Sequence, residues 1–339
     1  MAGRHINIPI FIPHLGCPNM CVFCNQRSIS GHSEFHAESV RGEIEAALST
    51  SLDTDEREIA FFGGSFTGID RALMRELLGI AYEYVQSGKV GSIRLSTRPD
   101  YIDGEILGIL SRYGVKTIEL GLQSFDDGVL IATKRGHTRE CAERACRAIK
   151  DAGFELIGQM MIGLPEADME SEIMTAREIC RLGADGARVY PTVVFYDTEL
   201  AHMCERGEYV ALDNESAVMR TKEVLKVFDA AGVPCIRVGL CASENLADAS
   251  KVMGGADHSS IGELAMGELY FDRICEEIEK RNIRGGELTV FVSRGSVSKA
   301  VGQKKKNKVR ICQKYGIKRV KVLEKSEIIG YNIILEHNI

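Results

Sequence analysis

Three cysteines near the N-terminus are spaced as ligands of a metal centre. Cys17, Cys21 and Cys24 follow a C-x₃-C-x₂-C pattern, so one short loop can turn three sulfurs toward a common point. Thiolates are the usual ligands of iron–sulfur clusters, and a four-iron cluster normally takes four of them, so three would leave one iron open. Two alternatives stay open: a structural zinc site that recruits His14 or His32 as a fourth ligand, and three buried cysteines without a metal.

A pair of glycines is the second candidate for a ligand site. Gly63 and Gly64 lie in the segment F-F-G-G-S-F-T, directly after an apolar run that is predicted to be a strand. Because glycine has no Cβ atom, its backbone can approach a bound molecule closely, although paired glycines also form plain turns.

Together these two motifs resemble those of the radical S-adenosylmethionine (SAM) superfamily. The resemblance implies that Cys17, Cys21 and Cys24 hold a [4Fe–4S] cluster whose open iron binds the amino and carboxylate groups of SAM. It also implies that an electron cleaves SAM to methionine and a 5′-deoxyadenosyl radical, which abstracts a hydrogen atom from a substrate. In the superfamily the glycine motif binds the SAM amino group. Here Ser65 replaces the usual acidic third residue, and backbone carbonyls can accept those hydrogen bonds instead.

Five further motifs narrow the resemblance to one branch, and they look like the radical SAM half of the elongator catalytic subunit over about residues 5–250. They are L-S-T-R-P-D-Y from Leu95, E-L-G-L-Q-S from Glu119, R-G-H-T from Arg135, Q-M-M-I-G-L-P from Gln159 and Y-P-T from Tyr190.

The resemblance to the elongator subunit and its coproporphyrinogen-dehydrogenase relatives also implies a set of SAM contacts. The positions matching Gln123 and Arg135 contact SAM, and the segments around Ser96, Ile162 and Gly163 line its ribose and adenine. The chemistry agrees, because a guanidinium pairs with a carboxylate and an amide satisfies ribose or carboxylate groups. From the residues alone, Arg135 could instead form a surface ion pair and Gln123 could cap a helix.

The chain departs from the elongator pattern in three places. Only about 90 residues follow the predicted barrel, without a visible acetyl-CoA pyrophosphate loop. The gap before the second cysteine is shorter than in that family, and Tyr196 and Asp197 replace its basic–glycine pair. We therefore expect a branch without the acetyltransferase domain, and the sequence gives no support for an acetyl-CoA-binding partner acting in trans.

Alternating strand and helix patterns must position these residues. Strands are predicted at 5–12, 58–62, 93–97, 117–121, 156–162 and 187–191, with 234–238 as a candidate seventh, and helices at 38–48, 71–86, 104–112, 140–152, 169–182 and 215–231. This alternation is typical of a parallel sheet with crossover helices, in which functional residues lie at the carboxyl ends of the strands. We predict an α/β fold: a partial (β/α)₆ radical SAM barrel over residues 1–250, a linking helix within 251–283, and a small basic α+β domain over 284–339.

The small domain carries an unusual share of positive charge. The net charge of the chain is −6, whereas residues 299–325 carry +10. Its predicted elements are strands at 288–292, 316–323 and 328–335 and helices at 295–301 and 306–315, after a linking helix at 261–280. Helix, G-x-x-G turn, helix and strand form the core of a KH module, whose loop holds a nucleic-acid backbone, and V-G-Q-K-K-K-N is similar although Lys305 occupies the second glycine position.

If this KH-like element binds RNA, its basic residues contact phosphates, and each contact weakens with salt. The candidates are Lys304, Lys305, Lys306, Lys308 and Arg310. A solvated helix face and a surface that docks a protein partner are the alternatives.

The sequence thus predicts a radical SAM enzyme that modifies RNA, with tRNA favoured and an electron donor such as flavodoxin or ferredoxin. Two other functions stay open: radical chemistry on a small metabolite such as a porphyrin or lipid precursor, and a non-catalytic iron–sulfur regulator that binds RNA. With no apolar run of about 18 residues and no signal peptide at the start, we expect a cytoplasmic protein without a membrane span.

Overall fold

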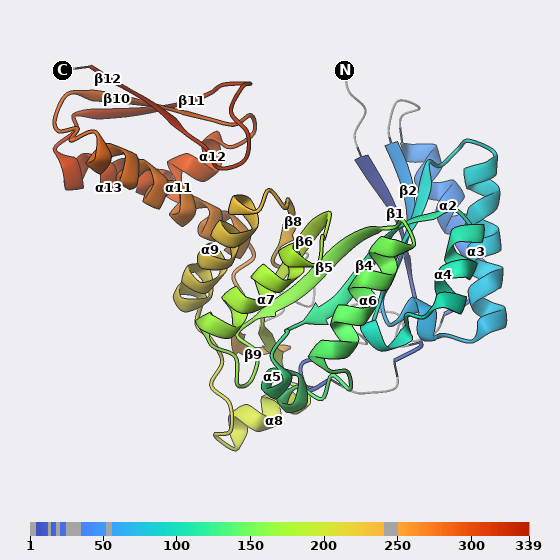
Figure 1. The fold of residues 1–339 in the computed structure, drawn as a ribbon. Helices are drawn as coiled ribbons and strands as arrows, with labels where there is room; N and C mark the ends of the chain where they lie inside the picture. The colour runs from blue at the N-terminus through green and yellow to red at the C-terminus, as the bar shows by residue number, and fades with distance from the viewer. Residues whose placement is uncertain are drawn as a thin grey trace.

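The structure, a computed structural model, describes residues 5–12, 15–17, 21–24, 35–51, 56–240 and 250–338. Within these residues the chain forms a large curved sheet covered by helices and a small sheet that one long helix connects to it (Figure 1).

The large sheet has seven parallel strands in the order β1-β2-β3-β4-β5-β6-β8. The strands are β1 (His5–Phe11), β2 (Glu56–Phe62), β3 (Ser92–Thr97), β4 (Val115–Gln123), β5 (Glu155–Ile162), β6 (Gly186–Pro191) and β8 (Cys235–Val238). Since β1 and β8 form the two edges, the sheet is an open half-barrel. The predicted α/β fold with a partial barrel is confirmed.

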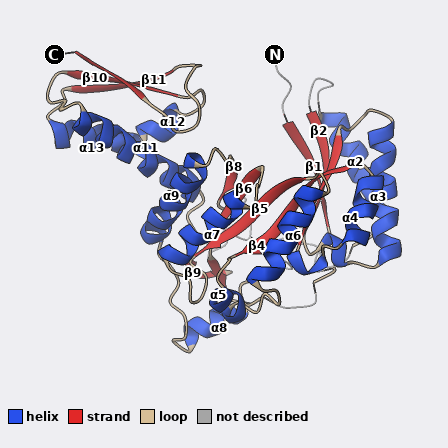
Figure 2. Cartoon of the chain, in the orientation of Figure 1, coloured by secondary structure: helices blue, strands red, loops and turns tan. Residues whose placement is uncertain are grey.

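Helices cover the outer face of this sheet (Figure 2). They are α2 (Ser39–Thr50), α3 (Arg71–Gln86), α4 (Gly104–Arg112), α6 (Arg139–Asp151), α7 (Met169–Arg181) and α9 (Asn214–Ala230). Most begin after a residue whose side-chain oxygen accepts a hydrogen bond from the first turn, as Asp103 does from the Ile106 amide at 2.8 Å. The short sequence D-x-x-I therefore fixes where α4 starts.

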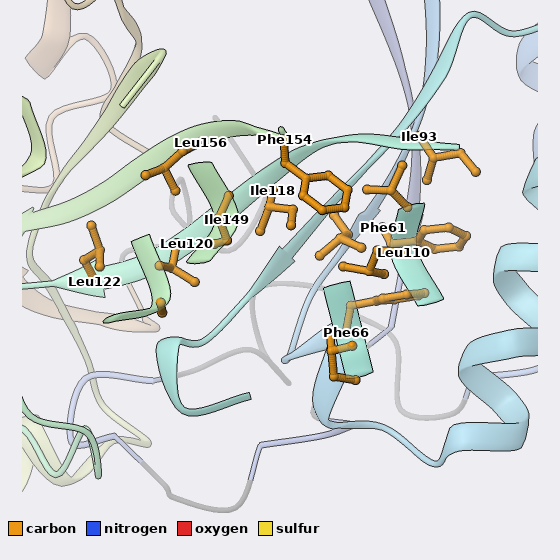
Figure 3. Packing of buried hydrophobic residues seen from close by; sticks show 14 of the residues in the cluster. Phe61, Phe66, Ile93, Leu110, Ile118, Leu120, Leu122, Ile149, Phe154 and Leu156 are labelled. Carbon is orange, nitrogen blue, oxygen red and sulfur yellow. The ribbon is translucent and has the colours of Figure 1, made fainter. Parts of the chain in front are cut away.

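The core lies between the sheet and these helices. Successive residues of a strand point to opposite faces, so Ile118, Leu120 and Leu122 of β4 face the helices and pack with Ile149 and Phe154 (Figure 3). The intervening residues of β4 therefore face the hollow side of the sheet.

The sheet curls strongly toward that hollow side. The guanidinium of Arg188 on β6 lies over the ring of Phe62 on β2, 5.5 Å from its centroid, although β3, β4 and β5 separate the two strands in the sheet. Only a curled sheet brings the inner faces of these strands within side-chain reach.

Several short elements were not predicted. Strands β7 (Val193–Phe195) and β9 (Val252–Gly255) form an antiparallel pair, and helices α5 (Asp127–Ala132) and α8 (Glu199–Glu205) follow β4 and β7. Helices η1 (Phe66–Gly68) and η2 (Pro99–Tyr101) are single 3₁₀ turns that follow β2 and β3.

The small C-terminal domain has a three-stranded sheet with helices on one face. Strand β10 (Glu287–Val292) pairs parallel with β11 (Arg319–Glu324) and antiparallel with β12 (Ile334–Asn338). Helix α11 (Ile261–Lys280) connects it to the half-barrel, and α12 (Val297–Val301), η3 (Gln303–Lys305) and α13 (Lys306–Tyr315) complete it.

The predicted strand at 328–335 is wrong in its bounds, because β12 begins only at Ile334. The apolar residues before it form turns: Ile329 is 79% exposed and Gly330 has a left-handed backbone with φ 62°. Among the described residues, no helix is both long and apolar enough to cross a membrane.

The burial of β4 predicts unequal effects of two isoleucine substitutions. Ile118→Ala should lower the free energy of unfolding by about 2–5 kcal/mol, because Ile118 is completely buried and alanine leaves a cavity. Ile131→Ala removes the same atoms from a side chain that is 78% exposed, and should change stability by less than about 0.5 kcal/mol. Urea unfolding of both variants measures this, and equal losses would contradict the described core.

Candidate cofactor site

A narrow pocket, with no volume open to a water-sized molecule, lies where β2 and β3 end. Its lining comes from the end of β1, the segment that leads to Cys17, and the two strand ends. The lining residues are Ile12, Leu15, Phe62, Gly63, Gly64, Ser65, Phe66 and Ser96.

The glycine pair shapes this pocket. Gly63 and Gly64 have φ 100° and 93°, a backbone that residues with a side chain rarely adopt. A Cβ atom on Gly64 would lie 2.4 Å from the Leu15 carbonyl oxygen, and the Ser65 amide donates to that same oxygen at 3.1 Å. The glycines therefore hold the end of β2 directly against the segment that carries Cys17.

Hydrogen bonds connect the described part of the cysteine loop around Val22 to two neighbouring segments. The Cys24 amide donates to the Cys21 carbonyl at 2.9 Å, which places these two cysteines on one turn. Val22 donates its amide to Thr133 and accepts from the Leu200 amide through its carbonyl. Cys17 is exposed, Cys21 is buried and Cys24 is half-buried.

No three His, Cys, Asp or Glu side chains within the described ranges gather closely enough to hold a metal ion. The zinc alternative depended on His14 or His32, and both lie outside the described residues.

Two arginines converge on the Cys21 sulfur. Arg135 Nη1 lies 3.2 Å from Cys21 Sγ, and Arg98 Nη1 lies 4.0 Å from it. Asp100 orients Arg98 through two 2.9 Å hydrogen bonds, and Arg98 Nη2 also donates to the Arg135 carbonyl. Two guanidinium groups therefore place positive charge beside the sulfur. Arg98 stands in the S-T-R-P-D motif, but sequence reasoning gave it no role.

Gln123 and Arg135 lie together at the end of β4. Gln123 has a left-handed backbone with φ 67° at an irregularity in the β4–β5 pairing. Arg135 Nη2 donates to the Gly121 carbonyl at 2.5 Å, and a Cβ atom on Gly121 would lie 3.3 Å from Gln123 Nε2.

Two polar atoms of this pair are buried without a hydrogen-bond partner, Gln123 Oε1 and Arg135 Nε. Buried polar groups are nearly always paired, so an unpaired acceptor beside an unpaired cationic donor indicates a place for a polar ligand. A ligand with hydroxyl and carboxylate groups, as SAM has, fits this donor and acceptor set.

The other predicted SAM contacts are already hydrogen-bonded. The buried Ser65 hydroxyl lies 3.0 Å from Thr97 Oγ1 and so already has a hydrogen-bond partner. Ser96 lines the pocket and lies 3.5 Å from Glu119 Oε2. At the end of β5, Ile162 is buried, and Gly163 donates its amide to Glu172 Oε1 at 2.7 Å.

The structure therefore brings one group of predicted residues together and leaves a second apart. Contacts described above link Cys21 to Arg135 and Gln123, and link the glycine pair to the segment before Cys17. The side chains of Cys17, Cys21 and Cys24 do not gather closely enough to hold a metal ion. Ile162 and Gly163 share the same edge of the sheet but are linked to that group by no described hydrogen bond.

His137 is a buried residue of this region that sequence reasoning did not single out. Neither ring nitrogen has a hydrogen-bond partner. Burial, aided by the positive charge of Arg135, lowers the pKa of His137 to about 3, so the ring is neutral near pH 7.

The predicted nucleic-acid residues lie far along the chain, around the turn between α12 and α13. Arg310 Nη1 contacts both carboxylate oxygens of Glu268 on α11, at 2.7 and 2.8 Å, and Lys306 Nζ lies 3.4 Å from Glu268 Oε1. Lys304, Lys305 and Lys308 have no carboxylate partner among the described residues.

The backbone of this turn is unusual. Lys304 and Lys305 both have left-handed conformations, with φ 51° and 63°. Buried Asn307 fixes the turn, because its Nδ2 donates to the Gly267 carbonyl at 2.7 Å and to the Ala300 carbonyl at 3.3 Å. A pocket lined in part by Gly302, Lys304 and Lys305 lies beside it.

Two family models match consecutive parts of the chain: the Radical SAM superfamily over residues 11–179 and the Radical_SAM C-terminal domain over residues 184–270. The chain belongs to the radical SAM superfamily. The motif resemblance to the elongator branch agrees with the relatives described next.

Among curated proteins, the chain is 24% identical over 267 residues to elongator complex protein 3 of Saccharomyces cerevisiae, covering 73% of this chain and 47% of that protein. It is 30% identical over 246 residues to a tRNA uridine(34) acetyltransferase of Methanocaldococcus jannaschii, covering 66% and 44%. The chain thus spans about half the length of these relatives. The solved structure of archaeal Methanocaldococcus infernus Elp3 shares the fold, with a TM-score of 0.61 and 20% identity, covering 84% of this chain and 65% of that one.

Radical SAM proteins use a [4Fe–4S] cluster and SAM. As a member of this superfamily, the chain uses the same two cofactors. The unpaired buried atoms of Gln123 and Arg135 fit the hydroxyl and carboxylate groups of SAM.

The ligand assignment predicts that Cys21→Ala abolishes the visible absorbance of the anaerobically reconstituted iron–sulfur protein, because a cubane needs each of its three thiolates. Cys180→Ala, a half-buried cysteine on α7, should leave that absorbance intact. Unchanged absorbance in the Cys21 variant would show that the cluster is held elsewhere.

The buried neutral His137 predicts a pH dependence of stability. The unfolded chain binds a proton at this histidine near pH 6.5, whereas the folded chain does so only near pH 3. Folding therefore loses about 1.4 kcal/mol per pH unit as the pH falls below 6.5. Between pH 7 and pH 5, His137→Gln should lose about 2 kcal/mol less unfolding free energy than the parent chain.

Chemical denaturation of the cluster-free chain at both pH values measures this difference. His202→Gln makes the same exchange at an exposed position and is the control. A drop in the His137 variant as large as in the parent chain would contradict a neutral buried ring.

Proposed function

We propose that this protein is a radical SAM enzyme that reductively cleaves SAM and modifies a nucleotide of RNA, with tRNA as its substrate. The observation that carries the proposal is the pocket shared by the glycine pair and the cysteine segment, where Gly63 and Gly64 meet Leu15, two residues before Cys17. Reductive cleavage of SAM requires the SAM-binding residues to lie beside the cluster ligands. The glycine pair and the segment that leads to Cys17 lie side by side in this way.

When bound, the cluster and SAM supply a radical that abstracts a hydrogen atom from the substrate. Cys17, Cys21 and Cys24 hold the cluster, and the backbone of Gly63 and Gly64 accepts the SAM amino group. The left-handed glycines allow the end of β2 to pack directly against the segment that leads to Cys17, which keeps the two roles adjacent.

The remaining SAM contacts come from the ends of β3, β4 and β5. Arg135 pairs with the SAM carboxylate through the guanidinium atom that has no partner, and Gln123 Oε1 accepts from a ribose hydroxyl. Ser96, Ile162 and Gly163 line the ribose and adenine, and Ser65 contributes its backbone.

The RNA substrate is supported by the names of the relatives and by the basic turn. Elp3 and a tRNA uridine(34) acetyltransferase are among the similar proteins, although the chain spans only about half of each. The lysine-bearing turn supplies phosphate contacts, with Lys304, Lys305 and Lys308 as the principal ones and Lys306 and Arg310 sharing Glu268.

A target base must be unpaired or flipped out to reach a buried site, so loop nucleotides are its natural position. We place the enzyme in the cytoplasm with a flavodoxin or ferredoxin as electron donor. We do not propose acetyl transfer.

The proposal predicts that changing Lys304, Lys305 and Lys308 to alanine lowers tRNA affinity at least about tenfold. It should also reduce the slope of log affinity against log salt by about three, because three phosphate contacts are lost. The matched control changes Lys89, Lys116 and Lys280 to alanine, which alters the net charge equally at exposed positions outside the turn.

The measurement is anaerobic 5′-deoxyadenosine formation from SAM and a reductant, with and without bulk tRNA, for parent chain, variant and control. We expect tRNA to stimulate the parent chain and control, and the variant to need much more tRNA. Cleavage of SAM that is indifferent to tRNA in all three would overturn the RNA substrate while keeping the radical SAM assignment.

A further inference from the structure

The hollow side of the half-barrel carries charged side chains where a closed barrel holds apolar ones. Arg94 on β3 donates to Glu58 Oε2 at 2.6 Å and to Glu119 Oε1 at 2.9 Å. Arg188 on β6 donates to the same Glu119 oxygen at 2.8 Å. Both buried carboxylates therefore have arginine partners, and the negative charge of this face is compensated.

Strand β8 adds a further guanidinium to this face. Arg237 is the register partner of Arg188 across the β6–β8 pairing, so two cationic side chains lie side by side on neighbouring strands. Among the described residues, Arg237 faces no carboxylate, and its hydrogen bond is from Nε to the Gly239 carbonyl at 3.3 Å. Arg188 is already paired with Glu119, so Arg237 brings a positive charge to this face that no described carboxylate balances, and a bound anion would balance it.

Tyr190 adds a neutral donor to the same place. It lies two residues after Arg188 on β6, and its hydroxyl oxygen accepts from Arg188 Nη1 at 3.2 Å. Burial raises the pKa of Tyr190, so the hydroxyl keeps its proton. Because its oxygen already accepts from Arg188, its hydrogen is directed to another acceptor, which no described residue supplies.

The cluster borders the pocket described above. The guanidinium of Arg188 lies over the ring of Phe62, which lines that pocket. Arg237 is half-buried on β8, the edge strand of the sheet among the described residues.

We propose that Arg188, Tyr190 and Arg237 form a subsite that binds an anionic group of the substrate, namely a phosphate, next to the cofactor pocket. The inference rests on the proposed function, in which the substrate is a nucleotide within RNA. Two guanidinium groups offer several N–H donors to one phosphate, and the tyrosine hydroxyl adds another. A carboxylate of a small metabolite has the same chemistry and is the other source that the test must distinguish.

The test titrates uridine 5′-monophosphate, uridine and glutarate into the full chain with its cluster and SAM, anaerobically and without reductant. A pyrimidine is used so that the probe does not compete for the adenine position of SAM. We expect the monophosphate to bind at least about tenfold more tightly than uridine. Arg237→Gln should remove this preference, and Arg237→Lys should retain part of it because it restores the charge.

Arg177→Gln, at an exposed position on α7, is the matched control and should keep the full preference. Equal affinity for the monophosphate and uridine in the parent chain, or an undiminished preference in Arg237→Gln, would overturn the subsite. If tRNA still stimulates SAM cleavage in that case, the subsite alone fails. If glutarate binds through Arg237 and the monophosphate does not, the phosphate assignment and the RNA substrate both fail, and the substrate is a carboxylate.

Discussion

The shape of the half-barrel depends on the buried carboxylate of Glu119. It lies at the centre of β4, 1% exposed, and accepts hydrogen bonds from Arg94 on β3 and Arg188 on β6. A buried charge without a partner costs several kcal/mol, so these arginines must stay within reach of it. Their strands are thereby held in a curl, and the carboxyl ends of β2, β3 and β4, where the candidate cofactor residues gather, lie along one edge of the curled sheet.

The regular part of this fold could be predicted from the sequence because each strand and helix has its own pattern. The order of β1 to β6 and the helices between them follow from apolar runs and capping residues such as Asp103. The pair β7 and β9 could not be predicted, because three- and four-residue strands have no periodicity and their partners lie more than fifty residues apart. The misplaced start of β12 has a related cause: an apolar run does not reveal that Ile329 is exposed.

The candidate site divides in the same way. Cys17, Cys21, Cys24, Gly63 and Gly64 were singled out because their type and spacing are local signals. Partnerships between distant residues were not predictable: Glu119 needed a partner that the sequence did not name, and Arg98 meets Cys21 across 77 positions. Likewise, the sequence of the lysine-rich turn does not reveal that Glu268 on α11 pairs with Lys306 and Arg310. It also does not reveal that Lys304, Lys305 and Lys308 have no carboxylate partner among the described residues.

The left-handed turn of Lys304 and Lys305 has an energetic consequence for the small domain. Such a backbone costs a residue with a side chain about 1–2 kcal/mol, which glycine avoids. Domains of this size bury little surface and have little stability in reserve. Lys304 and Lys305 therefore add positive charge to the surface of the turn while their strained backbone lowers the stability of the small domain.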